Sequence, residues 1–180
     1  AYGRPGGGGS IGGAQTGTGG GPALGPARRM IAVKVICVGK LKEAFYQQAC
    51  AEYEKRLKGF CRLEVVELPE DTRPGNLVRE AEKIRQAIPQ GSYTVALCIE
   101  GTTMSSEKLS AKITGLKNSG VSRLCFVLGS SEGMDESIKR QADLRLSMSP
   151  MTFPHHLARV MLLEQLYRAF AIEAGTKYHK

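Results

Sequence analysis

The chain has 180 residues, and its 25 lysines and arginines against 17 acidic residues give a net charge of +8 at pH 7. Its apolar runs all fall short of the roughly 20 residues that a membrane-spanning helix needs, so we expect a soluble protein without membrane contact. The five cysteines form no C-x-x-C pair, and together with the three histidines they show no zinc-ligand spacing, which excludes a zinc site as the basis of the fold. Their odd number also argues against a disulfide framework and indicates a protein of the reducing cytoplasm.

The first 29 residues differ in composition from the rest, with twelve glycines and no acidic residue. Such a stretch buries too little apolar surface to offset the entropy lost on ordering it. We expect residues 1–29 to be a disordered glycine-rich extension, or an artefact of expression or upstream translation, and residues 30–180 to be a single domain. Without the three arginines of the extension the net charge is +5, an excess compatible with a polyanionic partner.

From residue 30 onward, short β-rich apolar runs alternate with longer segments of helical period, which predicts an α/β sheet. The predicted strands are residues 31–38, 62–68, 93–99, 123–128 and 144–148. The predicted helices are residues 42–58, 76–88, 105–120, 135–142 and 156–174, with Asn76 as the cap of the second. The last helix carries a wide apolar stripe that includes Leu157, Met161 and Tyr167, which is typical of a core or a dimer interface.

A G-x-S-x-G pattern, residues 129–133, lies between a predicted strand and a helix, where a hydrolase would carry its nucleophile. Ser131 would then be the nucleophile. Its partners in chain order would be Asp135 or Asp143 and then His155 or His156. The domain is short for such a hydrolase and has no HGGG-like segment, so a tight turn beside a ligand is the stronger interpretation.

Two other segments are unusual. No G-x-G-x-x-G follows the first strand and no Walker A motif is present, so a nucleoside cofactor would have to bind elsewhere. Residues 147–154 combine two prolines with small polar residues, Met and Phe, which suits an adenine or methionine moiety, although taken alone the pattern favours a stiff structural connection. The terminal residues 178–180 (Tyr-His-Lys) are either a solvated tail or a reactive cluster.

Taken together, the motifs GSSEGMDES, SPMTFPH, EQLYRA and the terminal YHK closely resemble the ribosomal RNA large subunit methyltransferase H family. The opening IAVKVICVGKLKEAFYQQACAEYEKRL is also similar, so the resemblance covers essentially all of residues 30–180. It departs from the family at Ser130, where members often have a second glycine, and at Lys180, where many have arginine. Lysine keeps the positive charge but cannot form the bidentate fork of arginine to phosphate.

The resemblance implies a SPOUT-type α/β fold with a carboxyl-terminal trefoil knot, which periodicity could not have predicted. It implies a homodimer that uses S-adenosylmethionine, without a metal, to methylate N3 of a pseudouridine in 23S rRNA within the ribosome or large subunit. Carried over by position, the cofactor contacts are Leu97, Gly129, Met148, Ser149, Pro150, Met151, Thr152 and Phe153. The rival class is a noncatalytic RNA- or ribosome-binding protein, which the same basic surface would support.

Candidates for handling the target base and its phosphates lie at the two ends of the last helix. They are His155, Arg159, Tyr178, His179 and Lys180. A histidine could accept the imide proton, and a cation could stabilise the deprotonated base. Two alternatives remain open: His155 merely caps the helix, and Arg159 merely pairs with Glu164 or Glu132.

Overall fold

The structure is a computed structural model that describes residues 30–179, apart from the side chain of His179. The expectation for residues 1–29 lies outside the described residues. Strands and helices alternate along the described chain, as the sequence predicts. The elements are β1 (Ala32–Val38), α1 (Ala44–Leu57), β2 (Arg62–Leu68), α2 (Asn76–Ala87), β3 (Tyr93–Thr103), α3 (Ser106–Asn118), β4 (Arg123–Leu128), α4 (Glu136–Gln141), β5 (Leu144–Ser147), α5 (His155–Glu173) and a short 3-10 helix, η2 (Lys177–His179).

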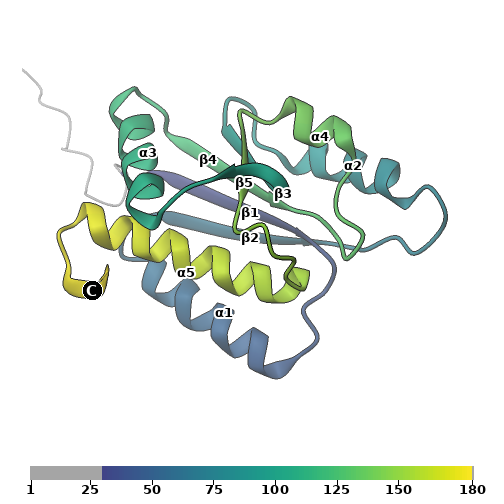
Figure 1. The fold of residues 1–180 in the computed structure, drawn as a ribbon, viewed down its shortest axis with the longest axis horizontal. Coiled ribbons are helices and arrows are strands. Elements are labelled where there is room, and N and C mark those ends of the chain that lie inside the picture. The colour runs from purple at the N-terminus through teal and green to yellow at the C-terminus, as the bar shows by residue number, and fades with distance from the viewer. Residues whose placement is uncertain (1–29, 180) are drawn as a thin grey trace, which may run out of the picture.

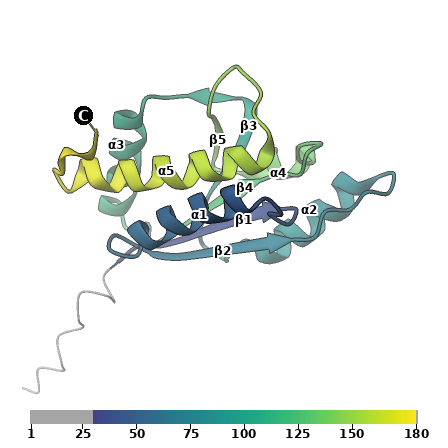
Figure 2. The same ribbon diagram turned by 90° about the horizontal axis from the view of Figure 1, so that it is seen from below.

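The strands form one sheet in the order β2-β1-β4-β3-β5, and every pair is parallel. Val35 in β1, for example, pairs with Val65 on one side and Phe126 on the other. Figures 1 and 2 show α1, α3 and α5 on one face of the sheet and α2 and α4 on the other. Because the strands are parallel, the loops that follow them gather at the carboxyl ends of the strands, where open α/β sheets bind ligands.

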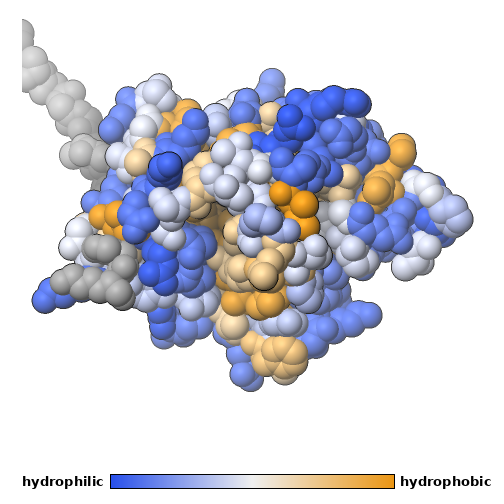
Figure 3. Space-filling view, in the orientation of Figure 1, coloured by the Kyte–Doolittle hydropathy of each residue, from blue (hydrophilic) through white to orange (hydrophobic). Residues whose placement is uncertain are grey.

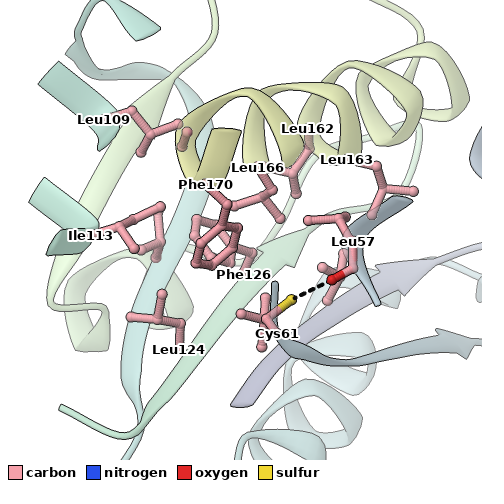
Figure 4. Close-up of a cluster of buried hydrophobic side chains, with 14 of the residues drawn as sticks. Leu57, Cys61, Leu109, Ile113, Leu124, Phe126, Leu162, Leu163, Leu166 and Phe170 are labelled. Atoms are coloured by element: carbon pink, nitrogen blue, oxygen red, sulfur yellow. Dashed lines mark hydrogen bonds between the residues drawn. The ribbon is translucent and has the colours of Figure 1, made fainter. Parts of the chain in front are cut away.

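The core has two layers, because strands covered on both faces send alternate side chains to opposite sides. Phe126, Leu162 and Leu166 are fully buried between the sheet and α1, α3 and α5 (Figure 4). Ile36 and Val127 lie in the smaller cluster under α2 and α4. This double coverage explains why the strands appear in the sequence as nearly continuous apolar runs.

The cysteines behave as small apolar side chains, as the sequence predicts. All five are free thiols, and four of them are buried. Burial raises the pKa of the Cys61 and Cys125 thiols to about 12, so neither is a reactive thiolate. No described helix is long and apolar enough to cross a membrane.

Two local predictions are wrong. The cap of α2 is Gly75, with φ of 75°, and Asn76 is the first helical residue. A left-handed Gly75 turns the chain into the helix, so the Asn76 side chain is free to donate to Glu132 Oε2 at 2.9 Å instead of capping. Strand β3 also continues past Ile99 to Thr103, because its outer half pairs again with β5.

Candidate functional site

A cavity of about 660 Å³ lies at the carboxyl ends of the strands, between β3, β4 and β5 and the start of α5. Its volume is within the range of roughly 300–1,000 Å³ that is usual for small-molecule sites. The residues predicted to contact a cofactor line this cavity, with the exception of Pro150. The lining ones are Leu97, Gly129, Met148, Ser149, Met151, Thr152 and Phe153. Segments up to 56 residues apart in sequence therefore meet at one cavity.

The turn after β4 forms one wall and depends on a close backbone approach. Ser130 and Gly133 exchange two backbone hydrogen bonds, each 2.9 Å long. A Cβ atom on Gly129 would lie 2.2 Å from the carbonyl oxygen of Gly133, so no larger residue fits there without moving the turn. The G-x-S-x-G pattern is thus explained by the geometry of this turn.

The serine-hydrolase alternative is wrong, because neither His155 nor His156, the predicted partners, is hydrogen-bonded to Ser131. The Ser131 hydroxyl donates instead to Glu70 Oε1 at 2.7 Å. Asp135 accepts from the backbone of Ser137, and Asp143 accepts from the backbone N–H of Thr94. A nucleophile needs a base within hydrogen-bond reach, itself oriented by a third group, and the described residues around Ser131 form no such chain of contacts.

A second wall comes from an outward excursion of β3. Leu97 and Thr102 both pair with Leu146 in β5, so the four residues between them leave the ladder. Among these, Glu100 lines the cavity. A Cβ atom on Gly101 would lie 2.8 Å from the backbone of Arg145, so the chain passes too close there for a larger residue. The excursion brings polar groups to a cavity that is otherwise mainly apolar.

The charged pair in this cavity was not predicted from the sequence. Lys139 of α4 donates to Glu100 Oε1 at 2.5 Å, and only 16% of the Lys139 side chain is exposed. Burial lowers the pKa of Lys139, but the hydrogen bond to Glu100 and the nearby negative charges together outweigh it, so the pKa of the ammonium group is raised. Both side chains are therefore charged at neutral pH. A charged residue directly after a buried strand, as Glu100 is, was the available sequence signal.

The loop that leads into α5 is folded by its own serines. The Ser147 hydroxyl donates to the carbonyl oxygen of Ser149, and the Ser149 hydroxyl accepts from the backbone N–H of Met151 at 3.0 Å. These local bonds hold the methionine and phenylalanine side chains against the cavity. Met151 is nevertheless 73% exposed, so this wall is open on one side.

Two adjacent histidines stand where α5 meets the cavity. His155 lines the cavity, and its Nε2 atom is buried with no hydrogen-bond partner among the described residues. Burial and the neighbouring His156 lower the pKa of His155, so its imidazole is neutral at pH 7. His156 differs, because its Nδ1 atom lies 3.1 Å from Glu43 Oε2. The cap of α5 is Pro154, so the capping alternative for His155 is wrong.

Arg159 lies one turn further along α5 and outside the cavity lining. It is 4% exposed, and its Nη1 and Nη2 atoms donate to Glu67 Oε2 and to the carbonyl oxygen of Gly39, at 2.6 and 2.9 Å. The alternative pairing with Glu164 or Glu132 is wrong, because Glu164 pairs with Arg168. Arg159 therefore joins α5 to the ends of β1 and β2.

The carboxyl-terminal tail folds back on the other half of α5. The Tyr178 ring packs on Tyr167 with centroids 4.6 Å apart, and its hydroxyl donates to Glu164 Oε1 at 3.3 Å. Glu164 is nine residues beyond His155, which is roughly 14 Å along a helix axis. Tyr178 and the cavity are thus separate within one chain. The side chain of His179 and all of Lys180 lie outside the described residues.

Within residues 30–179, no three His, Cys, Asp or Glu side chains come together as metal ligands would. The polar groups that face the cavity are one ion pair, hydroxyls, backbone amides and a neutral imidazole. Such groups can bind a nucleoside or an amino-acid moiety and can accept a proton.

Comparison with known proteins gives a consistent result. A family model described as a predicted SPOUT methyltransferase matches residues 31–179. The ribosomal RNA large subunit methyltransferase H of Streptococcus equi subsp. zooepidemicus is 41% identical over 157 residues, covering 82% of this chain and 99% of the relative. The protein of the same name from Acetivibrio thermocellus has the same identity and coverage. A solved structure of a probable methyltransferase from Bordetella pertussis has a similar fold, with a TM-score of 0.52 at 13% identity over 80% of this chain and 99% of that one.

Proposed function

Because this chain belongs to the ribosomal RNA large subunit methyltransferase H family of SPOUT methyltransferases, we propose that it transfers a methyl group from S-adenosylmethionine to N3 of a pseudouridine in 23S rRNA. The observation that carries the proposal is the convergence of three loops on one cavity. The predicted cofactor contacts come from the ends of β3, β4 and β5, and all but Pro150 line that cavity.

The cavity suits the cofactor in size and chemistry. Its apolar side chains, such as Leu97, Met148 and Phe153, can pack on an adenine ring, while backbone groups of the surrounding loops can pair with the polar edge of the ring. The Glu100 carboxylate is an acceptor for ribose hydroxyls, and the Lys139 ammonium keeps it ionised. When bound, S-adenosylmethionine supplies a methyl group that its sulfonium already activates.

The protein then has two tasks, which are to align the acceptor and to remove a proton. The imide N3 of pseudouridine must lose its proton before it can attack a methyl group. His155 is the candidate to accept it, since it lines the cavity and its imidazole is neutral at pH 7. Arg159 contributes as a positioning residue, because its bonds to Glu67 and Gly39 fix the first turns of α5.

The tail enters the proposal through a second copy of the chain. Within one chain Tyr178 is held on α5 away from the cavity, so we propose that residues 178–180 complete the site of the partner in a homodimer. Figure 3 shows a band of apolar residues across the middle of the face that carries α5. The partly exposed side chains of this helix include Leu157, Met161 and Tyr167, the residues predicted for the interface.

Three further parts of the proposal concern fold, partner and location. The trefoil knot is supported by the path of the chain from β5, at the edge of the sheet, back to α5, which packs between α1 and α3.

A single small domain can read little RNA sequence, so we propose that an assembled ribosome or large subunit in the cytoplasm is the substrate and that its shape provides specificity. Phosphate contacts would make this binding weaken with salt.

Calorimetry with S-adenosylmethionine, followed by transfer of radiolabelled methyl groups to ribosomes, tests the function. We expect heat of cofactor binding, and label in large-subunit rRNA only when the target position is pseudouridine. A noncatalytic RNA-binding protein would give no heat with the cofactor. Undiminished transfer to ribosomes with uridine at that position would refute the acceptor, and full activity on short naked RNA would refute the assembled substrate.

A further inference from the structure

We propose that Arg73 and Arg79 form a binding site for backbone phosphates of the rRNA substrate, held ready by the buried carboxylate of Asp71. The site lies in the loop between β2 and α2, outside the cofactor cavity. This inference rests on the proposed function and extends it to the surface that holds the RNA.

Both arginines are fixed by one carboxylate. Asp71 Oδ1 accepts from Arg73 Nε at 3.0 Å, and Asp71 Oδ2 accepts from Arg73 Nη2 and Arg79 Nε, each at 2.7 Å. The Asp71 side chain is only 6% exposed, whereas those of Arg73 and Arg79 are 74% and 40% exposed. The hydrogen bonds from Arg73 and Arg79 hold the pKa of Asp71 far below its usual range, so the carboxylate stays ionised.

The loop is ordered beneath the two guanidinium groups. The backbone N–H of Asp71 donates to Glu80 Oε1 of α2, and Arg79 Nη2 also donates to the carbonyl oxygens of Arg73 and Pro74. Within the group formed by Asp71, Arg73 and Arg79, one carboxylate thus holds two cations, which leaves one positive charge in excess among these three residues. Neither Nη1 atom donates a hydrogen bond to a described residue, so each guanidinium keeps free N–H groups for an anion.

Ordered guanidinium groups match the geometry of phosphate oxygens, and less side-chain entropy is lost when they bind. Three further carboxylates lie around this loop. Glu70 accepts from Ser131, Glu80 accepts from the Asp71 backbone, and Glu132 accepts from Asn76. Each of these donors is neutral, and Asp71 is the one described carboxylate that is hydrogen-bonded to Arg73 or Arg79.

The position of the loop fits a surface that holds substrate beside the cavity. It follows β2, so it lies beyond the carboxyl ends of the parallel strands, as the cavity does (Figure 1). Two hydrogen bonds, Ser131 to Glu70 and Asn76 to Glu132, join the loop to the turn at residues 129–133 that forms the cavity wall. RNA phosphates on the arginines would thus be next to a target base entering the site.

The exposed Lys40 extends the same surface. The backbone N–H of Gly39 donates to the carbonyl oxygen of Leu68 at 2.8 Å, so the loops after β1 and β2 start side by side. Lys40 is the next residue, and within residues 30–179 it makes no ion pair. Cations from two loops therefore border one end of the sheet, which is the pattern of a backbone-binding surface.

The test compares full-length wild type with Arg73→Ala, Arg73→Ala/Arg79→Ala and Arg73→Lys/Arg79→Lys. The control is Arg62→Ala, which removes one exposed charge at the amino end of β2, the opposite end of the strand from the proposed site. Binding to unmethylated large subunits is measured from 50 to 200 mM salt, together with KM, kcat and calorimetric affinity for S-adenosylmethionine. Each lost phosphate contact lowers the slope of log affinity against log salt by roughly 0.7–0.9.

We expect the slope to fall by roughly one for Arg73→Ala and by roughly two for the double alanine variant. KM for the particle should rise at least tenfold in the double variant, with kcat and cofactor affinity within twofold of wild type. The double lysine variant should regain most of the slope, and Arg62→Ala should keep all of it. If Arg73→Ala, which leaves Arg79 on Asp71, keeps the wild-type slope and KM, the inference is overturned. Failure of wild type to bind the cofactor or transfer methyl groups would instead overturn the proposed function.

Discussion

Arg159 Nη1 donates to Glu67 Oε2 at 2.6 Å, and this pair joins α5 to β2 across 92 residues of sequence. The same Glu67 oxygen accepts from the backbone N–H of Leu41, and Arg159 Nη2 donates to the carbonyl oxygen of Gly39. The loop after β1 is thus attached to α5 on two sides. His155, one helical turn before Arg159, is held beside the cavity by this network.

Replacing Arg159 with methionine should destabilise the protein by about 2 kcal/mol, because it removes a buried guanidinium group and its hydrogen bonds to Gly39 and to Glu67, whose side chain is 41% exposed. Urea denaturation at pH 7 measures this. The control, Arg140→Met, removes an exposed arginine and should change stability by at most about 0.5 kcal/mol. A loss below about 1 kcal/mol together with inactive enzyme would show that Arg159 acts on the substrate and not on the position of α5.

The turn after β4 offers a clean pair of glycine variants. Gly129→Ala should weaken S-adenosylmethionine binding at least tenfold, about 1.4 kcal/mol, because its Cβ would lie 2.2 Å from the Gly133 carbonyl oxygen and would displace the cavity wall. Gly115→Ala in α3 meets nothing within 4 Å and should instead raise stability by about 0.5–1 kcal/mol through helix propensity. Calorimetry on both variants decides, and equal affinities would contradict the role of the turn.

The protonation of His155 makes stability depend on pH. Burial and the neighbouring His156 lower its pKa below 6.5, so the folded protein binds fewer protons at this site than the unfolded chain does. Stability from this source is complete above pH 6.5 and is lost as the pH falls below that value. We expect an NMR titration midpoint below 6.5, and a smaller loss of stability between pH 7.5 and 5.5 in His155→Asn. An identical pH dependence in the variant would contradict this.

Deletion of residues 178–180 should leave folding and cofactor affinity nearly unchanged but lower methyl transfer at least tenfold, about 1.4 kcal/mol of barrier. Cofactor affinity should be unchanged because Tyr178 packs on the outer half of α5, away from the cavity of its own chain. If the tail completes the partner's site, mixing the truncated protein with Gly129→Ala should restore activity in the heterodimer. Wild-type turnover by the truncated protein alone would remove the tail from the site.

The dimer prediction depends on the exposed stripe of α5. Leu157→Arg places a charge among partly exposed apolar side chains and should yield a monomer at micromolar concentration in sedimentation, with the fold retained. Phe45→Arg in α1, also at an exposed apolar position, is the comparison outside the stripe and should remain dimeric. A wild-type protein that sediments as a monomer with intact cofactor affinity would refute the homodimer.

The amino-acid sequence by itself determined where the strands and helices lie, and its resemblance to a known family assigned the loops of the candidate cofactor site. Strands buried on both faces require unbroken apolar runs, and residues 62–68 and 123–128 are strands at the predicted bounds. Residues 147–154 were distinctive in composition, because prolines, small polar residues and apolar side chains are local signals, but that composition alone favoured a stiff connection and the resemblance assigned the cofactor contacts. The loop proved to be closed by its own serines.

Only the tertiary structure decided which charges meet. Arg159 had Glu164 five residues away, yet it pairs with Glu67, because the order of the strands brings the end of β2 under the start of α5. In the same way Lys139 meets Glu100 at the cavity, and one buried carboxylate, Asp71, holds Arg73 and Arg79. Hydrophobic periodicity reports which face of an element is buried, but it carries no information on which distant polar group lies opposite. That choice is made by strand order and by the requirement that a buried charge be paired.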